Sequence, residues 1–392
     1  MEAVKGRMLV RTTIVALLIA VGLGAAGPAD AAELEPRIAG GTTTSIEKWP
    51  WQVAFLTSKK KDPGKKPSER FFCGGSLIAP TIVVTATHCA LEIDLSKPEY
   101  FSVVAGRTNL NDVSKGTEVV VKDAVFPLTR SGVPRYLLFD LRWDVTILEL
   151  TEPIDQPTIK IAGPGEKDLI RPGTTAWKTG WGRHDEQGEG GISLILRKAK
   201  TAIQPPKACA YQQDGESPTA FDTDSQVCIG DPDADSSGCY GDSGGPSVVR
   251  SSDGFRLFGS TSYGIGYSCD PEDLSVDAAL AQKDVRDWIQ AVTIARSGVD
   301  PVGSGGQAEP LPEFCRVPDI TGLKLPKVKT RLRRANCRVG EVRSVVFFHG
   351  KRSRKRDNTV VEAGYSPFLL KKAGFKVDIV VGQWTLRHHR NE

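Results

Sequence analysis

The sequence predicts β-strands in its first part and a small α+β module at its C-terminal end, and three observations favour this order. Ile82–Thr85 is a β-branched run, which is typical of a buried strand. A second apolar run, Val145–Leu150, begins directly after the acidic Asp144. Beyond a Gly- and Pro-rich linker predicted at 298–314, the pattern changes to one helix and two strands (326–335, 342–348 and 375–381).

A glycine-rich turn surrounds one serine in the stretch GCYGDSGGPSVV at 238–249. Glycines gather where the chain must adopt a positive φ or where another group approaches the backbone closely. Such a turn presents the Ser243 hydroxyl beside backbone N–H groups, as an oxyanion hole requires. The same residue types are common in surface turns, so the motif alone leaves a catalytic turn and a surface turn equally open. A catalytic serine also needs a base, and the base needs an orienting group.

Few residues can serve as that base, because the chain contains only five histidines. The strand that begins at Ile82 is predicted to end at Thr87-His88-Cys89, so His88 lies at its end and directly before a cysteine. The other four lie in a polar loop, beside a basic run and in the C-terminal tail (His184, His349, His388 and His389). Asp144 stands at the mouth of a buried strand, where an unpaired carboxylate is costly. Pairing with His88 would account for a carboxylate at this position.

Seven motifs occur in the order found in one known family. They are RIAGG (37–41), CGGSLI (73–78), TATHC (85–89), DVTILEL (144–150), GWG (180–182), GDSGGP (241–246) and SYG (262–264). From Ile38 to about Arg296, the chain resembles the chymotrypsin/trypsin family of serine proteases. The resemblance implies an all-β double antiparallel β-barrel over residues 38–297, with the site in the cleft between the barrels.

The resemblance assigns a role to each candidate catalytic residue. Ser243 corresponds to the nucleophile, His88 to the general base, and Asp144 to the buried carboxylate that orients the imidazole. The N–H groups of Gly241 and Ser243 correspond to the oxyanion hole. The implied activity is hydrolysis of protein or peptide substrates through an acyl-enzyme intermediate, without a cofactor. The alternative is a non-catalytic homologue that uses the same scaffold as an extracellular or cell-wall binding protein.

The N-terminal residues predict export. Three basic residues (Lys5, Arg7 and Arg11) precede the apolar stretch Thr12–Gly27, whose 16 residues fall short of the ~20 that span a bilayer. Ala29-Asp30-Ala31 fits a small-residue cleavage signal. Residues 1–31 are therefore predicted to be a signal peptide and residues 32–37 a short pro-segment, with no transmembrane span later in the chain.

Maturation follows from the family resemblance. The resemblance implies cleavage after Arg37, which creates a new N-terminal ammonium on Ile38. That ammonium is expected to fold inward and pair with Asp242, since a buried charge needs a partner. The chain is thus expected to be a secreted zymogen.

Eight cysteines permit 105 connectivities, so their spacing alone assigns no pairs. Export favours disulfides. The resemblance implies Cys73–Cys89, Cys209–Cys228 and Cys239–Cys269, which leaves Cys315 with Cys337. The chain has no CxxC pair and no clustered histidines apart from the tail, so no metal site is predicted.

The primary specificity pocket is also placed by the resemblance. Ser237, six residues before the nucleophile, corresponds to the pocket floor. The other pocket residues are Ser262, Gly264, Ser275 and Asp277. A neutral Ser237 suggests a preference for large apolar or aromatic side chains. Asp277 leaves two interpretations open. Either it supplies a negative charge from the back wall and gives a basic preference, as self-cleavage after Arg37 would require, or it faces solvent and another protease performs the activation.

Residues 315–384 resemble a single PASTA module, a small α+β unit of bacterial cell-wall enzymes and receptor kinases, and residues 385–392 form a tail. The likeness lies in VPDITGL (317–323), CRVG (337–340) and KVDIVVG (376–382). A core this small benefits from a disulfide such as Cys315–Cys337. The resemblance favours a bacterial source.

Charge divides unevenly along the chain. Residues 316–392 contain 19 Lys and Arg against six Asp and Glu, a net of +13 within a whole-chain charge of +4, so residues 1–315 carry −9. A basic module on an exported chain suggests an anionic cell-wall polymer as partner. Without an aromatic stacking pattern, nucleic-acid recognition is not favoured. A solvated basic face without a specific partner is the open alternative.

Overall fold

A computed structural model describes residues 41–91, 93, 96–136, 141–183, 191–210, 221–230, 238–265, 269, 273–307, 313–349, 359–363 and 370–386. The predicted signal peptide and pro-segment, the Arg37–Ile38 bond, the pocket residue Ser237 and residues 387–392 of the tail lie outside the described residues.

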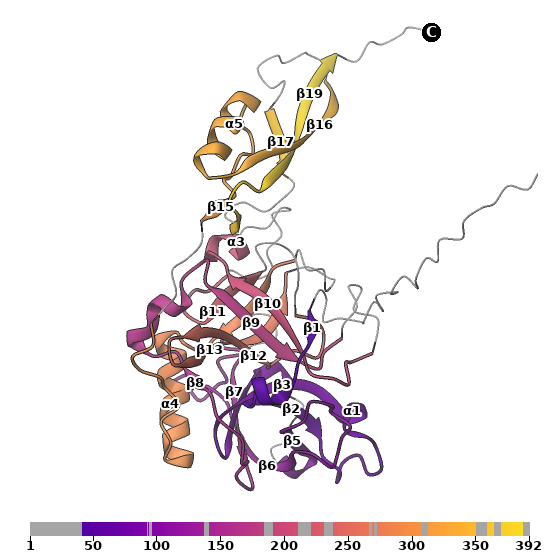
Figure 1. The fold of residues 1–392 in the computed structure, drawn as a ribbon, viewed down its shortest axis with the longest axis vertical. Coiled ribbons are helices and arrows are strands. Elements are labelled where there is room, and N and C mark those ends of the chain that lie inside the picture. Colours follow the sequence, from indigo (N-terminus) through magenta and orange to yellow (C-terminus); the bar gives the residue numbers. More distant parts are fainter. Residues whose placement is uncertain are drawn as a thin grey trace, which may run out of the picture. The chain divides into compact units, whose positions relative to one another are not determined.

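The first barrel closes six antiparallel strands in the order β2-β3-β4-β7-β6-β5 (Figure 1). The strands are β2 (Gln52–Thr57), β3 (Phe71–Ala79), β4 (Ile82–Thr85), β5 (Phe101–Ala105), β6 (Thr117–Val125) and β7 (Thr146–Leu150). The β-branched run forms β4 as predicted, but the strand ends at Thr85 and not at Thr87–Cys89, because these residues belong to the one-turn helix α2. The barrel interior is apolar, with fully buried side chains such as Val53, Phe55, Leu77, Val103 and Ile147.

The second barrel also closes six antiparallel strands, β9-β10-β11-β14-β13-β12, because β9 pairs with both β10 and β12. The strands are β9 (Thr175–Gly180), β10 (Arg197–Ile203), β11 (Gln226–Gly230), β12 (Pro246–Ser251), β13 (Gly254–Gly264) and β14 (Ser275–Ala279). Two short strands extend this sheet: β1 (Thr42–Thr43) beside β10 and β8 (Lys160–Ile161) parallel to β13. The predicted double antiparallel barrel is confirmed.

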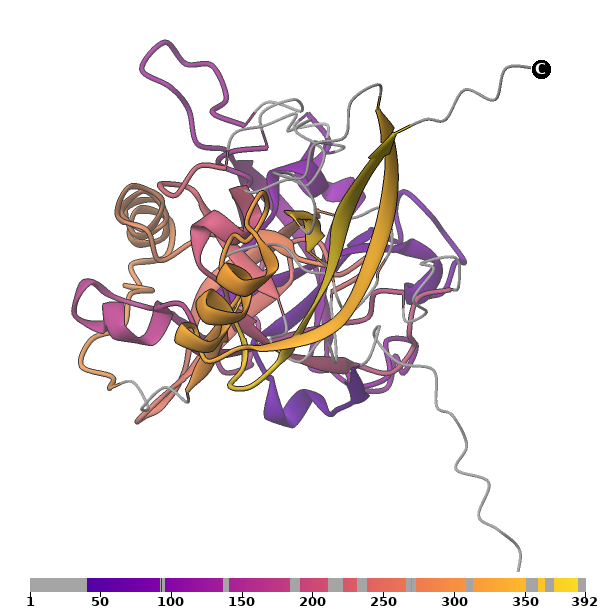
Figure 2. The same ribbon diagram turned by 90° about the horizontal axis from the view of Figure 1, so that it is seen from above.

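Short helices connect the strands: η1 (Ile46–Lys48), α1 (Pro67–Arg70), α2 (Thr87–Ala90), η2 (Pro98–Tyr100), η3 (Pro164–Ile170) and α3 (Pro206–Ala210). The longer α4 (Lys283–Ser297) lies on the outside of the barrels in both views (Figures 1 and 2). It buries Val285 and Ile289 and ends at Gly298, whose φ is 71°. Among the described helices, none has the length and apolar character needed to cross a membrane.

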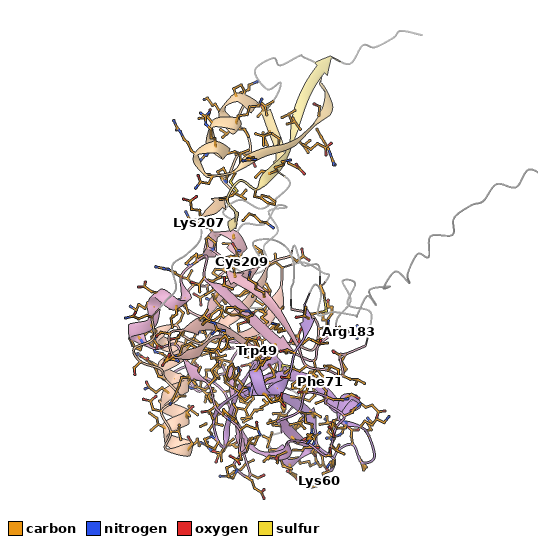
Figure 3. All side chains as sticks on the ribbon, viewed as in Figure 1. Trp49, Lys60, Phe71, Arg183, Lys207 and Cys209 are labelled. Carbon is orange, nitrogen blue, oxygen red and sulfur yellow. A yellow bond between two sulfur atoms is a disulfide. The ribbon has the colours of Figure 1, made fainter. Side chains whose placement is uncertain are left out.

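Aromatic side chains fix the two barrels against each other. The ring of Trp49, which lies where the barrels meet (Figure 3), is 5.1 Å from that of Phe255 in β13. Trp51 and Trp177 pack against the same phenylalanine, at 5.7 and 5.8 Å between ring centroids. A buried hydrogen bond of 2.5 Å joins Thr179 Oγ1 in β9 to Gln52 Oε1 in β2. These contacts matter for function, because the candidate site takes residues from both barrels.

The first part of the predicted linker is packed on the second barrel. Ile161 N donates to Pro301 O at 2.8 Å and Gly303 N donates to Ile161 O at 2.7 Å. Gly306 N donates to Glu166 Oε1 at 2.8 Å. We call residues 299–307 the strap. Its glycines permit close packing: a Cβ on Gly303 would stand 2.4 Å from Arg256 Nε. The expected free connection at 298–314 is thus corrected for these residues, while 308–312 lie outside the described residues.

The C-terminal residues form a second, smaller core. The elements are β15 (Phe314–Arg316), α5 (Leu325–Arg334), β16 (Arg338–His349), β17 (Thr359–Ala363), β18 (Leu370–Lys372) and β19 (Lys376–Leu386). β19 pairs parallel to β16 and antiparallel to β17, and β15 pairs with β18. Val328 and Leu332 of α5 are fully buried with Val377 and Ile379 of β19. The predicted helix is present, and Asn336, with φ 58°, lies just beyond its end.

Candidate active site

The imidazole of His88 is held by Asp144. β4 ends at Thr85, and the one-turn helix α2 then places His88 opposite the residue that precedes β7. Asp144 Oδ1 accepts the backbone N–H of His88 at 2.9 Å, and Oδ2 lies 2.7 Å from His88 Nδ1. Asp144 is almost completely buried. With the carboxylate ionised, Nδ1 carries the proton, so Nε2 is left as the basic nitrogen.

The pKa of His88 reflects two opposing effects. Burial of the ring lowers the pKa, whereas the hydrogen bond and the negative charge of Asp144 raise it, and the net direction is upward. A base with a raised pKa binds a proton more readily, which suits a group that must accept one from a hydroxyl.

The chain approaches Asp144 through a strained backbone. Leu141 and Trp143 have φ values of 50° and 57°, in the left-handed region that side chains with a Cβ rarely adopt. This conformation costs about 1–2 kcal/mol per residue. The guanidinium of Arg135 lies 3.9 Å from the centroid of the Trp143 ring, a contact that helps to hold the turn. The turn directs the Asp144 carboxylate inward, toward His88.

Ser262 supplies a third contact to Asp144, from the second barrel. Its hydroxyl donates to Asp144 Oδ2 at 2.5 Å. The sequence places Ser262 in the specificity pocket but does not predict this bond. In the structure β13 therefore links the pocket wall directly to the carboxylate that holds His88.

The turn around Ser243 has the conformation expected from its glycines. Gly241 and Gly244 have φ values of 94° and 75°. A Cβ on Gly244 would stand 2.2 Å from Thr85 Oγ1 and 2.6 Å from Gly74 O, so only glycine fits. Gly74 N donates to Ser243 O at 2.8 Å. The turn thus packs directly on β3 and on the end of β4.

The backbone donors of this turn fall into two groups. The N–H groups of Asp242, Gly244 and Gly245 donate to Cys239 O, Thr261 O and Asp242 O, at 3.0, 2.8 and 2.9 Å. Within the described residues, the N–H groups of Gly241 and Ser243 have no hydrogen-bond acceptor. Both residues are partly exposed. The two donors named for the oxyanion hole are therefore the two that the protein leaves available.

Ser243 and His88 belong to neighbouring segments. A Cβ on Gly244 would lie 3.0 Å from Ala86 N, two residues before His88. Among the described residues, no hydrogen bond joins Ser243 Oγ to His88 Nε2. The latter nitrogen instead lies 3.6 Å from Cys89 Sγ. Catalytic hydrogen bonds are often long in unliganded sites and shorten when substrate binds.

Asp242 is buried without a cationic hydrogen-bond partner among the described residues. Its carboxylate accepts the N–H groups of Gly182 and Cys239, each at 3.0 Å. Burial raises its pKa to about 6, although these two hydrogen bonds oppose the shift. Gly180 and Gly182 must be glycine because a Cβ on either would overlap the carboxylate, at 2.2 and 2.6 Å. The expected partner, Ile38, lies outside the described residues.

Neither interpretation of Asp277 matches its surroundings. Asp277 in β14 is fully buried and does not face solvent. Its Oδ1 accepts from Lys178 Nζ at 2.7 Å and its Oδ2 accepts from Ser247 Oγ at 2.5 Å. Lys178 therefore balances the negative charge expected at the back wall. A signal for this pair was present in the sequence: β9 and β14 are short apolar strands, each of which carries one charge of opposite sign at its centre.

Disulfides brace the segments that carry His88 and Ser243. The structure pairs Cys73 with Cys89, Cys209 with Cys228, Cys239 with Cys269 and Cys315 with Cys337, the same pairs that the sequence analysis gives. One group of potential metal ligands occurs within the described ranges, Cys73, His88 and Cys89. Because its two sulfurs are bonded to each other, this group offers no thiolate for a metal.

The structure combines two closed antiparallel barrels, a hydrogen-bonded pair of His88 and Asp144, and a serine in a glycine-rich turn. These features define a serine endopeptidase. The family model named Trypsin matches residues 38–289, so the chain belongs to the trypsin family. A protein named trypsin from Saccharopolyspora erythraea is 33% identical over 233 residues, which cover 58% of this chain and 87% of that protein. Coagulation factor XI from Bos taurus is 27% identical over 244 residues, which cover 60% of this chain and 35% of that protein.

Proposed function

We propose that Ser243, His88 and Asp144 form the catalytic triad of this endopeptidase. Ser243 Oγ attacks the carbonyl carbon of the scissile peptide bond as His88 Nε2 removes its proton. Asp144 holds the Nδ1–H and stabilises the imidazolium that forms. His88 then protonates the departing amine, and a water molecule repeats the sequence on the acyl-enzyme.

The observation that carries this proposal is the pair of available N–H groups on Gly241 and Ser243. Both lie on the turn that carries the Ser243 hydroxyl, where an oxyanion would form. One such donor typically contributes ~10²–10³ in rate. A surface turn of the same composition has no need of two donors directed away from every protein acceptor.

Labelling of the matured chain with a fluorophosphonate tests the triad. We expect covalent attachment at Ser243, located by mass spectrometry of the digested protein, and no attachment in Ser243→Ala. Ser131→Ala, an exposed serine of a loop, serves as the matched control and should be labelled like the wild type. A matured, folded wild type that resists labelling and hydrolyses no peptide would instead support a non-catalytic homologue.

We also propose that the chain is exported by the signal peptide 1–31 and matures by cleavage after Arg37. Four disulfides are typical of an oxidising compartment. Within the described part of the chain, the buried carboxylate of Asp242 accepts hydrogen bonds from backbone N–H groups alone, so it is suited to receive the ammonium of Ile38. Sequencing of the active secreted protein should give Ile38 as its first residue. Arg37→Ala should block cleavage by an Arg-specific protease and leave the chain inactive.

Residues 315–384 are proposed to be a PASTA-like module that binds an anionic cell-wall polymer. The support is the helix α5, which exposes Lys327, Lys329, Arg331, Arg333 and Arg334. No acidic residue occurs between Lys324 and Arg338. A polyanion placed along this helix would meet only positive side chains.

Co-sedimentation of the full Ser243→Ala chain with purified cell walls tests this role. Binding should weaken as salt rises and should be lost when the anionic polymer is extracted from the walls. Replacement of the five exposed basic residues of α5 by Gln should remove binding, whereas Lys59→Gln and Lys61→Gln in the first barrel should not. Binding that persists on extracted walls would contradict the proposal, and equal binding to DNA would show nonspecific charge attraction only.

A further inference from the structure

The buried ammonium of Lys178 lies close to Gly238, at the start of the turn that carries Ser243. Lys178 stands in β9 between Trp177 and Thr179, and its side chain is only 4% exposed. Its Nζ donates to Asp277 Oδ1 at 2.7 Å and to Ser275 Oγ at 3.3 Å. A Cβ on Gly238 would stand 3.7 Å from the same Nζ. The ammonium therefore lies between the turn that leads to Ser243 and the strand β14.

These neighbours are the residues that surround the expected specificity pocket. Gly238 precedes Cys239, which is bonded to Cys269. Ser275 pairs with Gly264 across β13 and β14. β13 runs from this pair back to Ser262, which bonds to Asp144. Lys178 thus contacts residues that the family resemblance places around the specificity pocket, and β13 links the wall of that expected pocket to Asp144.

The ammonium of Lys178 and the carboxylate of Asp277 differ in how they face the expected specificity pocket. The carboxylate of Asp277 is fully buried and both of its oxygens accept hydrogen bonds, from Lys178 and from Ser247. The ammonium has three N–H groups, of which Asp277 and Ser275 take two within the described residues. Apart from the two chain neighbours of Gly238, the described atoms within 4 Å of the position where its Cβ would stand belong to Lys178. The positive end of the pair is therefore the one directed at the pocket.

We propose that Lys178 is a specificity-determining residue that makes the base of the pocket a hydrogen-bond donor. The substrate side chain before the scissile bond would then be one that ends in an acceptor oxygen, Gln or Glu. Lys or Arg at this position would meet a like charge in a poorly solvated site, which is a strong means of rejection. This inference rests on the proposed catalytic function of Ser243.

One consequence concerns maturation. If the pocket rejects a basic side chain, the bond after Arg37 is a poor substrate for the enzyme itself. The chain then requires a different protease, with a preference for arginine, to generate Ile38. Purified uncleaved chain should accordingly remain uncleaved when mixed with a small amount of its own matured form.

The test uses the full chain, matured by an immobilised Arg-specific protease that is then removed. Matched peptide anilides that differ only in the residue before the anilide (Gln, Glu, Arg or Phe) are assayed, and fluorophosphonate titration counts the active sites. For the wild type we expect kcat/KM on Gln and Glu to exceed that on Arg at least tenfold. In Lys178→Met with Asp277→Asn, which removes both charges together, this ratio should fall about tenfold.

Two further variants sharpen the result. Asp277→Asn alone leaves the ammonium without its counter-charge, so the preference for Glu over Gln should rise several-fold. Lys198→Met, a half-exposed lysine of the adjacent strand β10, is the matched control and should keep the wild-type profile. Lys178→Met alone would leave Asp277 buried and unpaired, which disfavours folding. The double variant avoids this problem because it removes both charges.

The outcomes separate the two proposals. A labelled, active enzyme that cleaves the Arg substrate faster than Gln and Glu overturns the role of Lys178 and leaves the triad standing. An unchanged profile in the double variant does the same. A matured chain that is neither labelled at Ser243 nor active on any substrate overturns the proposed function, and the inference about the pocket falls with it.

Discussion

The two barrels have the same strand topology but contribute different kinds of residue to the cleft. In the first barrel the site residues follow or precede apolar strands: His88 comes after β4 and Asp144 before β7. In the second barrel the charges lie deeper, with Lys178 and Asp277 inside strands and Asp242 in the turn before β12. A base and its orienting carboxylate thus need only two strand ends that meet. The roles proposed for the second barrel, in maturation and substrate choice, instead rest on buried charges, each of which is costly unless paired.

The largest effect is expected from Asp144→Asn, which removes the carboxylate that the first barrel contributes to the site. Asparagine keeps the shape but removes the charge that fixes the tautomer of His88, a change that costs about 10⁴ in kcat in triads of this kind. Steady-state kinetics on the matured protein measure the loss. Asp123→Asn, an acidic residue of β6 in the same barrel, should leave kcat unchanged. A loss of less than tenfold in Asp144→Asn would argue against the triad.

Gly244→Ala breaks the contact through which the second barrel meets the first. The residue has φ 75°, and its new Cβ would overlap Thr85 Oγ1 and Gly74 O. We expect a loss of about 3 kcal/mol in unfolding free energy. Urea denaturation in the Ser243→Ala background, which prevents self-digestion, measures it. Gly64→Ala, with φ 81° and nothing within 4 Å, isolates the backbone part of the cost and should lose only about 1 kcal/mol. Equal losses in the two variants would show that the overlap is relieved.

The pH dependence of stability tests the proposed role of Asp242, the buried acidic residue in the turn before β12. Because the folded-state pKa of Asp242 is raised to about 6, the folded uncleaved chain binds more protons than the unfolded chain between about pH 4 and 6. Its stability should therefore fall as pH rises through this window, by about 2 kcal/mol from this group. The proposed pairing with the ammonium of Ile38 would lower the pKa of Asp242 in the matured chain and remove the fall. Denaturation of uncleaved and matured Ser243→Ala protein at pH 4 and 7 measures the difference, and parallel pH profiles would contradict the proposed pairing.

The smallest effect is expected in the strap, which covers a buried ion pair of the second barrel. Gly303→Ala would place a Cβ 2.4 Å from Arg256 Nε, which itself lies 3.0 Å from Glu166 Oε1. A loss of about 1–2 kcal/mol is expected, since Arg256 is buried and has little room to move. Gly165→Ala, beside Glu166 but with nothing within 4 Å, should change stability by less than about 0.5 kcal/mol. Similar values for the two variants would mean that the strap packs loosely.

Much of the fold and the site follows from local pattern. The strand Ile82–Thr85 agrees with its β-branched run, and the helix α5 agrees with its apolar spacing. The conformation of Gly241 and Gly244 follows from the crowding of glycines around Ser243. The linker prediction is wrong for the strap because composition does not distinguish glycines that permit flexibility from glycines that permit close packing. Only the side chain of Arg256, brought beneath Gly303 by folding, separates the two cases.

The amino-acid sequence by itself named the residues proposed to supply the hydroxyl, the imidazole and the carboxylate, because each lies in a short motif that resembles one of the trypsin family. The tertiary structure alone decided how the charges of the second barrel are matched. Lys178 and Asp277 are 99 positions apart, and Ser262 and Asp144 are 118 apart. Hydrogen bonds and ion pairs act over a few ångströms in space, so a lone charge in a strand signals that a partner is needed, but the residues next to it along the chain do not show which partner it meets.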